Sequence, residues 1–342
     1  MNKTILLCGS ILLTGANFFN REVSAQVPYE RISIRPRASF PELKSTVKNV
    51  IYENWNDQER GRIIPVKIYL PTQKSAGLSP VVIFSHGLGG SRDAAIYLGE
   101  FWSHHGYLCV FVQHPGSDSS VWQSALRGGK QAIMENMKLA ANGRNLIDRG
   151  KDIKFVLDEL AKKNQNDQIL KNQIDLSRVA LAGHSFGAGT ALLIAGQNFG
   201  PMGNMRDARV KAAIYLCPPV GHAKTDPVKA YGSITIPGLL LTGTEDNSPI
   251  GNTTAEERRI PFDGMKSSHQ YFVNFKGADH GVFGGRSFRP ALQTDEKYHE
   301  MIEQVTINFL DSTLRAQPKA TTWLNSTEVI SYLGSAASLE RK

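Results

Sequence analysis

The clearest indication of the fold is the motif Gly183-His184-Ser185-Phe186-Gly187, which directly follows the apolar run 178–182. A strand that turns into a helix through Gly-x-Ser-x-Gly holds its serine on a sharp, strained turn, with the hydroxyl clear of the backbone. The flanking glycines remove side chains that would crowd the turn. Small and apolar residues continue from Ala188 to Ala195 and favour a helix packed closely on a sheet. We therefore predict that Ser185 is a nucleophile at the end of a strand.

Short continuous apolar runs recur on both sides of this motif. Strands buried on both faces of a parallel sheet have this pattern, and the helix-like segments between them indicate βαβ alternation. The predicted strands cover residues 80–84, 107–112, 178–182, 210–216, 238–241 and 271–275, and the predicted helices cover 92–104, 142–163, 186–197 and 290–316. Ahead of them, residues 47–53 and 62–70 form an expected antiparallel hairpin. The sequence thus predicts an α/β fold that binds ligands at the carboxyl ends of its strands.

The first 25 residues have the pattern of a secretory signal peptide. Lys3 precedes an apolar stretch from Ile5 to Phe19, and Val23-Ser24-Ala25 forms a small-residue cleavage site. The apolar stretch is short for a membrane span, so we expect cleavage, a secreted or periplasmic protein, and no membrane-spanning segment in the mature chain. A Pro- and Arg-rich extended arm (26–46), the main domain (47–316) and a C-terminal tail (317–342) follow.

Charge and cysteine content narrow the classes of partner. The chain has 39 Lys and Arg against 31 Asp and Glu, a formal net charge of +8. These basic residues are scattered and form no nucleic-acid-binding motif, so we expect no nucleic-acid partner. Cys109 and Cys217 remain after cleavage of the leader; both lie in predicted core strands, and we expect buried free thiols. We expect no cofactor and no metal, because the Glu-x-x-His at 296–299 has no second copy.

A serine hydroxyl is a weak nucleophile that needs a base, and a carboxylate best holds that base in one tautomer. In serine hydrolases built on such sheets the acid and then the base follow the nucleophile, each at the end of a later strand. The strand at 238–241 leads into Glu245 and Asp246, and the strand at 271–275 leads into His280. We predict His280 as the general base and Asp246 as the acid. Glu245 stays an alternative, since a one-residue error in the loop would exchange the two carboxylates.

Acyl chemistry also needs hydrogen-bond donors for the developing oxyanion. The backbone N–H of Phe186 is one candidate, because it lies at the positive end of the predicted helix. The N–H of Leu88 is the second, in the glycine-rich loop 84–90 after the first parallel strand. The spacing of these glycines fits neither a dinucleotide nor a P-loop pattern. The polar insertions 114–141 and 247–268 are expected on the same rim, where they would shape the substrate cleft.

Three motifs together resemble the α/β-hydrolase superfamily: residues 84–89, residues 103–107 and the 183–187 turn. Within it they are most similar to secreted platelet-activating-factor acetylhydrolases and to bacterial proteins labelled predicted dienelactone hydrolases. The resemblance covers about residues 47–316. It implies an eight-stranded sheet with only the second strand antiparallel, a Ser–Asp–His triad that hydrolyses esters, and two strands between those of Cys109 and Cys217.

Two departures from these relatives bear on the substrate. Dienelactone hydrolases use a cysteine where Ser185 stands, and the membrane-contacting helices of the acetylhydrolases have no residue-by-residue match. The sequence therefore predicts an exported serine hydrolase of small-molecule or lipid-like carboxylic esters. Phospholipid acyl esters, polyesters and a non-catalytic binding role on the same fold stay open as alternatives. The sequence gives no oligomeric state.

Overall fold

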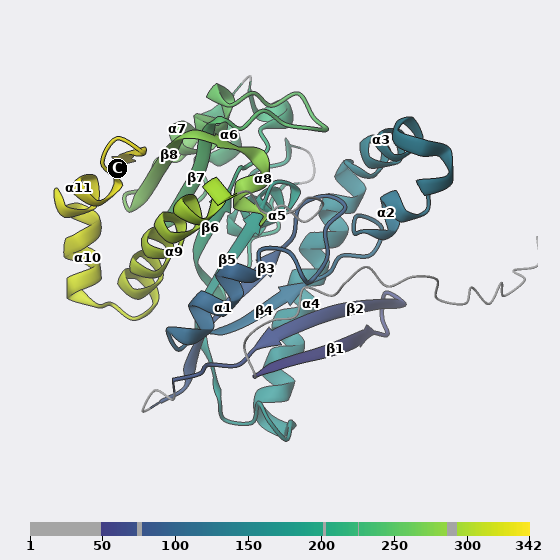
Figure 1. The fold of residues 1–342 in the computed structure, drawn as a ribbon. Coiled ribbons are helices and arrows are strands. Elements are labelled where there is room, and N and C mark those ends of the chain that lie inside the picture. Colours follow the sequence, from purple (N-terminus) through teal and green to yellow (C-terminus); the bar gives the residue numbers. More distant parts are fainter. Residues whose placement is uncertain (1–48, 74–76, 201–202, 225, 286–292) are drawn as a thin grey trace, which may run out of the picture. The chain divides into compact units, whose positions relative to one another are not determined.

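The computed structural model describes residues 49–73, 77–200, 203–224, 226–285 and 293–342. The expected signal peptide (1–25) and extended arm (26–46) lie outside the described residues. Residues 49 onward build a nine-stranded sheet with helices on both of its faces (Figure 1).

The strand order is β1-β2-β4-β3-β5-β6-β7-β8-β9. Strand β2 is antiparallel to both of its neighbours and β9 is antiparallel to β8, whereas the pairs from β4 to β8 are parallel. The bounds are β1 (Val50–Asp57), β2 (Arg62–Tyr69), β3 (Ser79–Ser85), β4 (Leu108–Val112), β5 (Ile174–His184), β6 (Val210–Leu216), β7 (Gly238–Glu245), β8 (Gln270–Asp279) and β9 (Ala337–Arg341). The predicted α/β fold with a mostly parallel sheet is confirmed, but the sheet has nine strands and not eight, because a second antiparallel strand, β9, closes the far edge.

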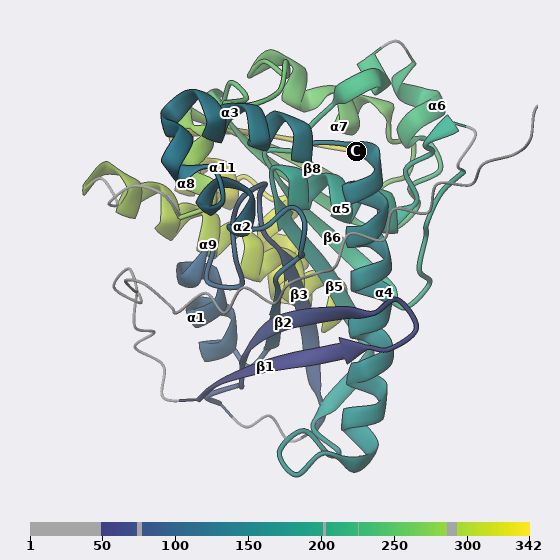
Figure 2. The ribbon, with the colours of Figure 1, turned by 90° about the vertical axis from the view of Figure 1, so that its right-hand side faces the viewer.

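The two faces of the sheet bury separate hydrophobic cores. Every residue of β3 is buried, and successive side chains go to opposite faces: Val82 and Phe84 join one core, and Val81 and Ile83 join the other. This is the pattern of a strand covered on both sides. Helices α1 and α9 contribute to the first core, and α4 and α5 to the second, so the fold has three layers (Figures 1 and 2).

The four predicted helices are present close to their expected positions, whereas two further long helices lie in the first insertion and in the C-terminal tail. Helix α4 begins after Asn142, whose side chain accepts a hydrogen bond from the Asn145 N–H at 2.9 Å and so caps the helix. The helices of eight or more residues are α1 (Ile96–His104), α3 (Gly129–Ala140), α4 (Gly143–Asn166), α5 (Phe186–Ala195), α9 (Gln293–Leu314) and α10 (Pro318–Asn325). The shorter α-helices are α2 (Ser120–Gln123), α6 (Pro227–Tyr231), α7 (Ile260–Gly264), α8 (His280–Phe283) and α11 (Glu328–Leu333).

The insertion at 114–141 folds into α2, a 3₁₀ turn at Leu126–Gly128, and α3. Its Trp122 indole donates to the backbone oxygen of Gly89 at 2.9 Å, so the insertion packs directly on the glycine-rich loop.

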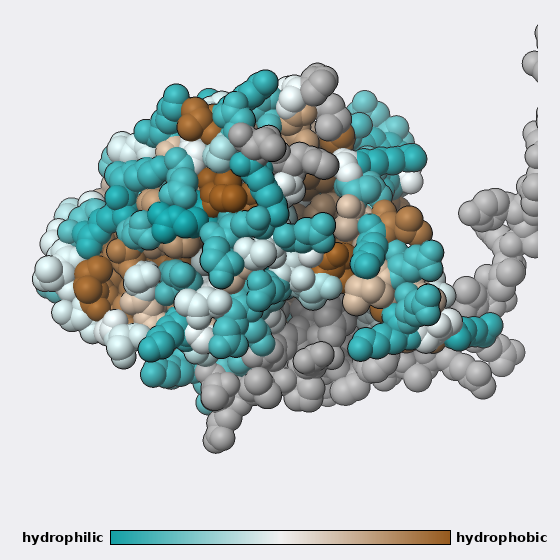
Figure 3. Space-filling view, turned by 90° about the horizontal axis from the view of Figure 1, so that it is seen from above, coloured by the Kyte–Doolittle hydropathy of each residue, from teal (hydrophilic) through white to brown (hydrophobic). Residues whose placement is uncertain are grey.

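Leu126 and Leu139 are the most exposed large apolar side chains of this insertion. Seen from above, apolar residues form several separate clusters among hydrophilic ones (Figure 3).

The sequence alone leaves the structure of the C-terminal tail open. Residues 318–341 form α10, α11 and β9, and Leu324, Val329 and Leu333 are buried in the same core as α9. Strand β9 pairs with β8 in the register Tyr271↔Arg341 to Phe275↔Ala337. A strand at the edge of a sheet has backbone N–H and C=O groups without hydrogen-bond partners, and β9 pairs with these groups of β8. The short, polar β9 sequence carries little strand signal of its own.

Among the residues that the structure describes, Cys109 and Cys217 are free and buried, as expected. Cys109 lies in β4 and Cys217 follows β6, with β3 and β5 between them in the sheet. Within the part of the chain that the structure describes, no helix combines the length and the apolar character that a membrane crossing requires.

Candidate active site

Ser185 lies on the turn between β5 and α5. Its backbone has φ +54° and ψ −117°, a conformation that costs a non-glycine residue about 1–3 kcal/mol. The Ser185 N–H donates to the Leu216 carbonyl at 2.8 Å, which ties the turn to β6. A Cβ on Gly183 would lie 2.2 Å from the Gly187 oxygen, and one on Gly187 would lie 1.9 Å from the Ser85 oxygen. Both flanking positions therefore require glycine, and the strained serine is held by its surroundings.

His280 follows β8 and begins the short helix α8. The Asp279 side chain accepts hydrogen bonds from the N–H groups of Gly281 (2.9 Å) and Val282 (3.2 Å), so it caps this helix. The cap fixes the backbone from which the imidazole projects. His280 Nε2 lies 2.9 Å from Ser185 Oγ, and the His280 side chain is 13% exposed. The structure thus brings the predicted base to the predicted nucleophile.

Asp246 follows β7 and is completely buried. Its Oδ1 lies 2.5 Å from His280 Nδ1, and its Oδ2 accepts a hydrogen bond from the Thr242 hydroxyl at 2.7 Å. Glu245, the alternative acid, is exposed at the end of β7. The structure therefore places Asp246, and not its neighbour, against the imidazole.

Arg258 is a member of this cluster that the sequence analysis missed. It comes from the second insertion, is 1% exposed, and its guanidinium lies 3.2 Å from Asp246 Oδ1. It also donates at 3.0 Å to the carbonyl oxygens of Cys217 and Pro218, which follow β6. Burial alone raises the pKa of the Asp246 carboxyl, but the hydrogen bond from His280 and the charge of Arg258 hold that pKa below its usual value. His280 and, through Arg258, the insertion together favour the ionised carboxylate.

The two predicted oxyanion donors lie on adjoining segments. Phe186 is the first residue of α5, where a helix leaves its N–H without an intrahelical partner. Leu88 lies in the turn after β3, and a Cβ on Gly87 beside it would be 3.5 Å from Ser185 Cβ. Within the described ranges, no hydrogen bond takes up either N–H. Both segments therefore border the serine, with donors available for a ligand.

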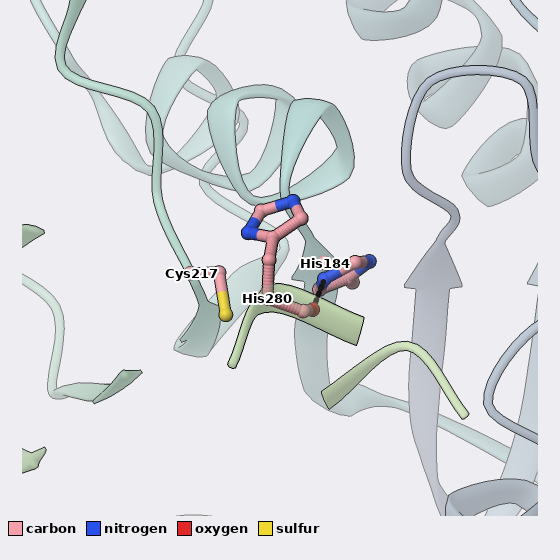
Figure 4. Close-up of side chains that lie close together, drawn as sticks. All are labelled: His184, Cys217 and His280. Carbon is pink, nitrogen blue, oxygen red and sulfur yellow. Dashed lines mark hydrogen bonds between the residues drawn. The ribbon is translucent and has the colours of Figure 1, made fainter. Parts of the chain in front are cut away.

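His184, Cys217 and His280 form a cluster that could be mistaken for a metal centre (Figure 4). Their ligand atoms lie within 4.8 Å of one another. However, His184 Nε2 lies 3.0 Å from the His280 carbonyl oxygen, and both His280 nitrogens already face the serine and the aspartate. In Figure 4 the His280 ring and the Cys217 sulfur point in opposite directions. Burial also raises the pKa of the Cys217 thiol, so the cluster lacks the thiolate that a metal favours.

Comparison with known proteins gives two kinds of match. The family model described as the alpha/beta hydrolase fold matches residues 80–238, which include the glycine-rich loop and the serine turn. Proteins named platelet-activating factor acetylhydrolase are similar over longer stretches. The protein from Cavia porcellus is 25% identical over 76% of this chain and 63% of its own length.

The protein of the same name from Bos taurus is 26% identical over 60% of this chain and 50% of its own length. The one from Canis lupus familiaris is 30% identical over 33% of this chain and 31% of its own. The chain therefore spans less than two thirds of the length of each of these relatives. Together with the mostly parallel, helix-covered sheet, these matches support the assignment of the chain to the α/β-hydrolase superfamily.

Proposed function

We propose that this protein is a serine hydrolase of carboxylic esters, with Ser185 as nucleophile, His280 as general base and Asp246 as the orienting acid. One observation carries the proposal: the His280 ring lies between the Ser185 hydroxyl (2.9 Å) and the Asp246 carboxylate (2.5 Å). A nucleophile, a base within hydrogen-bond reach and a third group that orients the base are the parts that acyl transfer requires.

The reaction proceeds through an acyl-enzyme. His280 Nε2 accepts the proton of Ser185 while Oγ attacks the ester carbonyl, and the N–H groups of Leu88 and Phe186 stabilise the tetrahedral oxyanion. His280 then protonates the departing alcohol as the tetrahedral intermediate collapses. Water, deprotonated by the same imidazole, attacks the acyl-enzyme; the bond to Ser185 Oγ then breaks, His280 returns the proton to that oxygen, and the carboxylic acid is released.

Replacement of the nucleophile tests this proposal. Ser185→Ala is expected to lower kcat on p-nitrophenyl acetate by about a thousandfold or more, because the covalent route is lost. Ser331→Ala is a matched control, since Ser331 is exposed on α11. A loss of less than tenfold in Ser185→Ala, with the melting temperature unchanged, would contradict the assignment.

Phospholipid acyl esters are a second candidate substrate class. The names of the similar proteins favour it, but the chain spans only part of those relatives. A panel of p-nitrophenyl esters from acetate to laurate, run beside a short-chain phospholipid and a polyester film, separates the classes. A higher kcat/KM on the phospholipid than on any p-nitrophenyl ester would favour lipid action. Turnover of the soluble esters alone would favour a general esterase, and release of acid from the film would favour a polyester hydrolase.

Export is a further part of the proposal, and it rests on the leader-like pattern of residues 1–25. We expect the processed protein to begin at Gln26 and to be recovered from the periplasm or the medium. Mass spectrometry of the fractionated protein checks this expectation. Full-length chain retained in the membrane fraction would contradict it.

A further inference from the structure

Ser85, His114 and Asp152 form a second hydrogen-bonded series of hydroxyl, imidazole and carboxylate, which we call the Ser85 triplet. It lies at the start of the glycine-rich loop and beneath it. Ser85 Oγ is 3.0 Å from His114 Nε2, and His114 Nδ1 is 3.0 Å from Asp152 Oδ2. All three residues are completely buried. The order of groups matches that around Ser185, but a substrate has no access to Ser85. Any role of these three residues must therefore come from the backbone segments that they hold in place.

The charges around the Ser85 triplet determine which nitrogen of His114 carries the hydrogen. Asp152 also accepts hydrogen bonds from Arg60 at 2.8 Å and Arg62 at 3.1 Å. Burial alone raises the pKa of Asp152, but the hydrogen bonds from His114 and Arg62 hold it below its usual value. Burial lowers the pKa of His114 to about 4, so its ring is neutral at pH 7. A neutral ring facing a carboxylate donates from Nδ1, and Nε2 is left to accept the Ser85 hydroxyl.

The backbone of His114 also sets the tautomer of His86, the residue that follows Ser85 in the loop. The backbone N–H of His114 donates to His86 Nε2 at 3.1 Å. The hydrogen of the neutral His86 ring therefore sits on Nδ1, which lies 2.6 Å from the carbonyl oxygen of Gly87. Burial and then the charge of Arg149 lower the pKa of His86 far below its usual value, so this donor arrangement holds at neutral pH.

Arg149, from α4, reinforces that carbonyl from the same side. It is completely buried, and its guanidinium donates to the backbone oxygens of His86 at 2.6 Å and Gly87 at 3.4 Å. Burial lowers the pKa of Arg149 to about 9, which leaves the group charged at neutral pH. Its guanidinium carbon also lies 4.6 Å from the centre of the Phe186 ring. One buried cation thus contacts both segments that carry the proposed oxyanion donors.

Peptide geometry connects these contacts to the donor. The Gly87–Leu88 peptide is trans and planar, so its C=O and its N–H point to opposite sides. The Gly87 C=O lies against His86 and Arg149 and also accepts a hydrogen bond from the Gly90 N–H at 3.0 Å, so the Leu88 N–H points away from these groups. The geometry points to Arg149 and His86 as positioning residues that aim the Leu88 N–H at the oxyanion. This inference rests on the proposed ester hydrolysis at Ser185.

Kinetics of loop variants test the inference. The parameters are kcat and KM for p-nitrophenyl acetate, with active sites counted by fluorophosphonate titration. His86→Leu removes one of the donors to the Gly87 carbonyl, and is expected to lower kcat about 10- to 100-fold with KM within about twofold, because an oxyanion donor acts mainly in the transition state. His86→Asn places an amide where Nδ1 stood and should recover most of that loss. Arg149→Lys keeps the charge but loses the forked donors, and should show the same loss of kcat at constant KM.

Exposed His104 supplies the matched control, since His104→Leu makes the same change on the surface and should leave kcat unaltered. If His86→Leu does not fold, Arg149→Lys and His86→Asn decide through the same comparison of kcat with KM. Unchanged kcat per titrated site in His86→Leu and Arg149→Lys, or no recovery in His86→Asn, would overturn the inference. Activity retained in Ser185→Ala would instead overturn the proposed function, so the two failures are distinguishable.

Discussion

The partners of the two His280 nitrogens determine which nitrogen carries the hydrogen. Nδ1 faces the Asp246 carboxylate, while Nε2 faces the Ser185 hydroxyl. Since Asp246 is held in its ionised form, Nδ1 donates to it, and Nε2 is left as the proton acceptor that Ser185 needs. The sequence predicts that a carboxylate follows β7. It leaves Glu245 and Asp246 open, because only the loop conformation turns one of them inward.

Matched amide substitutions test the role of the acid. Asp246→Asn is expected to lower kcat by about a thousandfold or more at neutral pH, because an amide can donate to Nδ1 and favour the wrong tautomer. Glu245→Gln makes the same carboxylate-to-amide change one residue earlier on an exposed side chain, and should alter kcat by less than threefold. Steady-state kinetics of the two purified variants provide the comparison. The reverse ranking would transfer the role to Glu245.

Among the structural elements, the turn between β5 and α5 is the one that the sequence predicts most completely. A Cβ on Gly183 would lie 2.2 Å from a backbone oxygen, and a Cβ on Gly187 would lie 1.9 Å from another, so both positions require glycine. The sequence pattern predicts the same turn. Arg258 and Arg149 could not be assigned in this way. Arg258 is one of two adjacent arginines in the second insertion, and Arg149 is one of several charged residues of α4. Only the packing of distant elements turns each of them inward.

A pair of glycine substitutions tests the strain argument. Gly183→Ala is expected to lower the free energy of unfolding by about 3 kcal/mol, because its Cβ collides with the backbone of Gly187. Gly143→Ala is the control: it lies in the first turn of α4 with open space around its Cα, and should raise stability by up to about 1 kcal/mol. Urea unfolding of both variants measures the difference. Equal stability of the two would mean that the turn is not as tightly packed as described.

At the scale of the whole molecule, the three-layer arrangement follows from apolar runs and their spacing, whereas the second antiparallel edge does not. Strand β9 forms because β8 offers an open edge and because α10 and α11 bury apolar side chains beside α9. Those are long-range causes that a local pattern cannot reveal. The fold also buries two neutral histidines, His86 and His114, which makes its stability depend on pH.

The sign of this dependence follows from the lowered pKa values. His114 has a pKa of about 4 in the folded protein against about 6.5 when unfolded, so between these values the unfolded chain binds more protons. The free energy of unfolding should therefore fall as the pH drops below about 6.5, by roughly 1 kcal/mol per pH unit for each such histidine. Urea unfolding at pH 6 and pH 5 tests this expectation. His114→Gln should reduce the slope by about that amount and His104→Gln should not; equal slopes in all three proteins would contradict it.

Mass spectrometry after treatment with a fluorophosphonate shows whether the Ser185 hydroxyl is the reacting group. Our expectation is one added phosphonyl group per chain, located on the peptide that contains Ser185, with much slower addition in His280→Gln and none in Ser185→Ala. Label on another residue, or ester hydrolysis that persists without any label on Ser185, would contradict it.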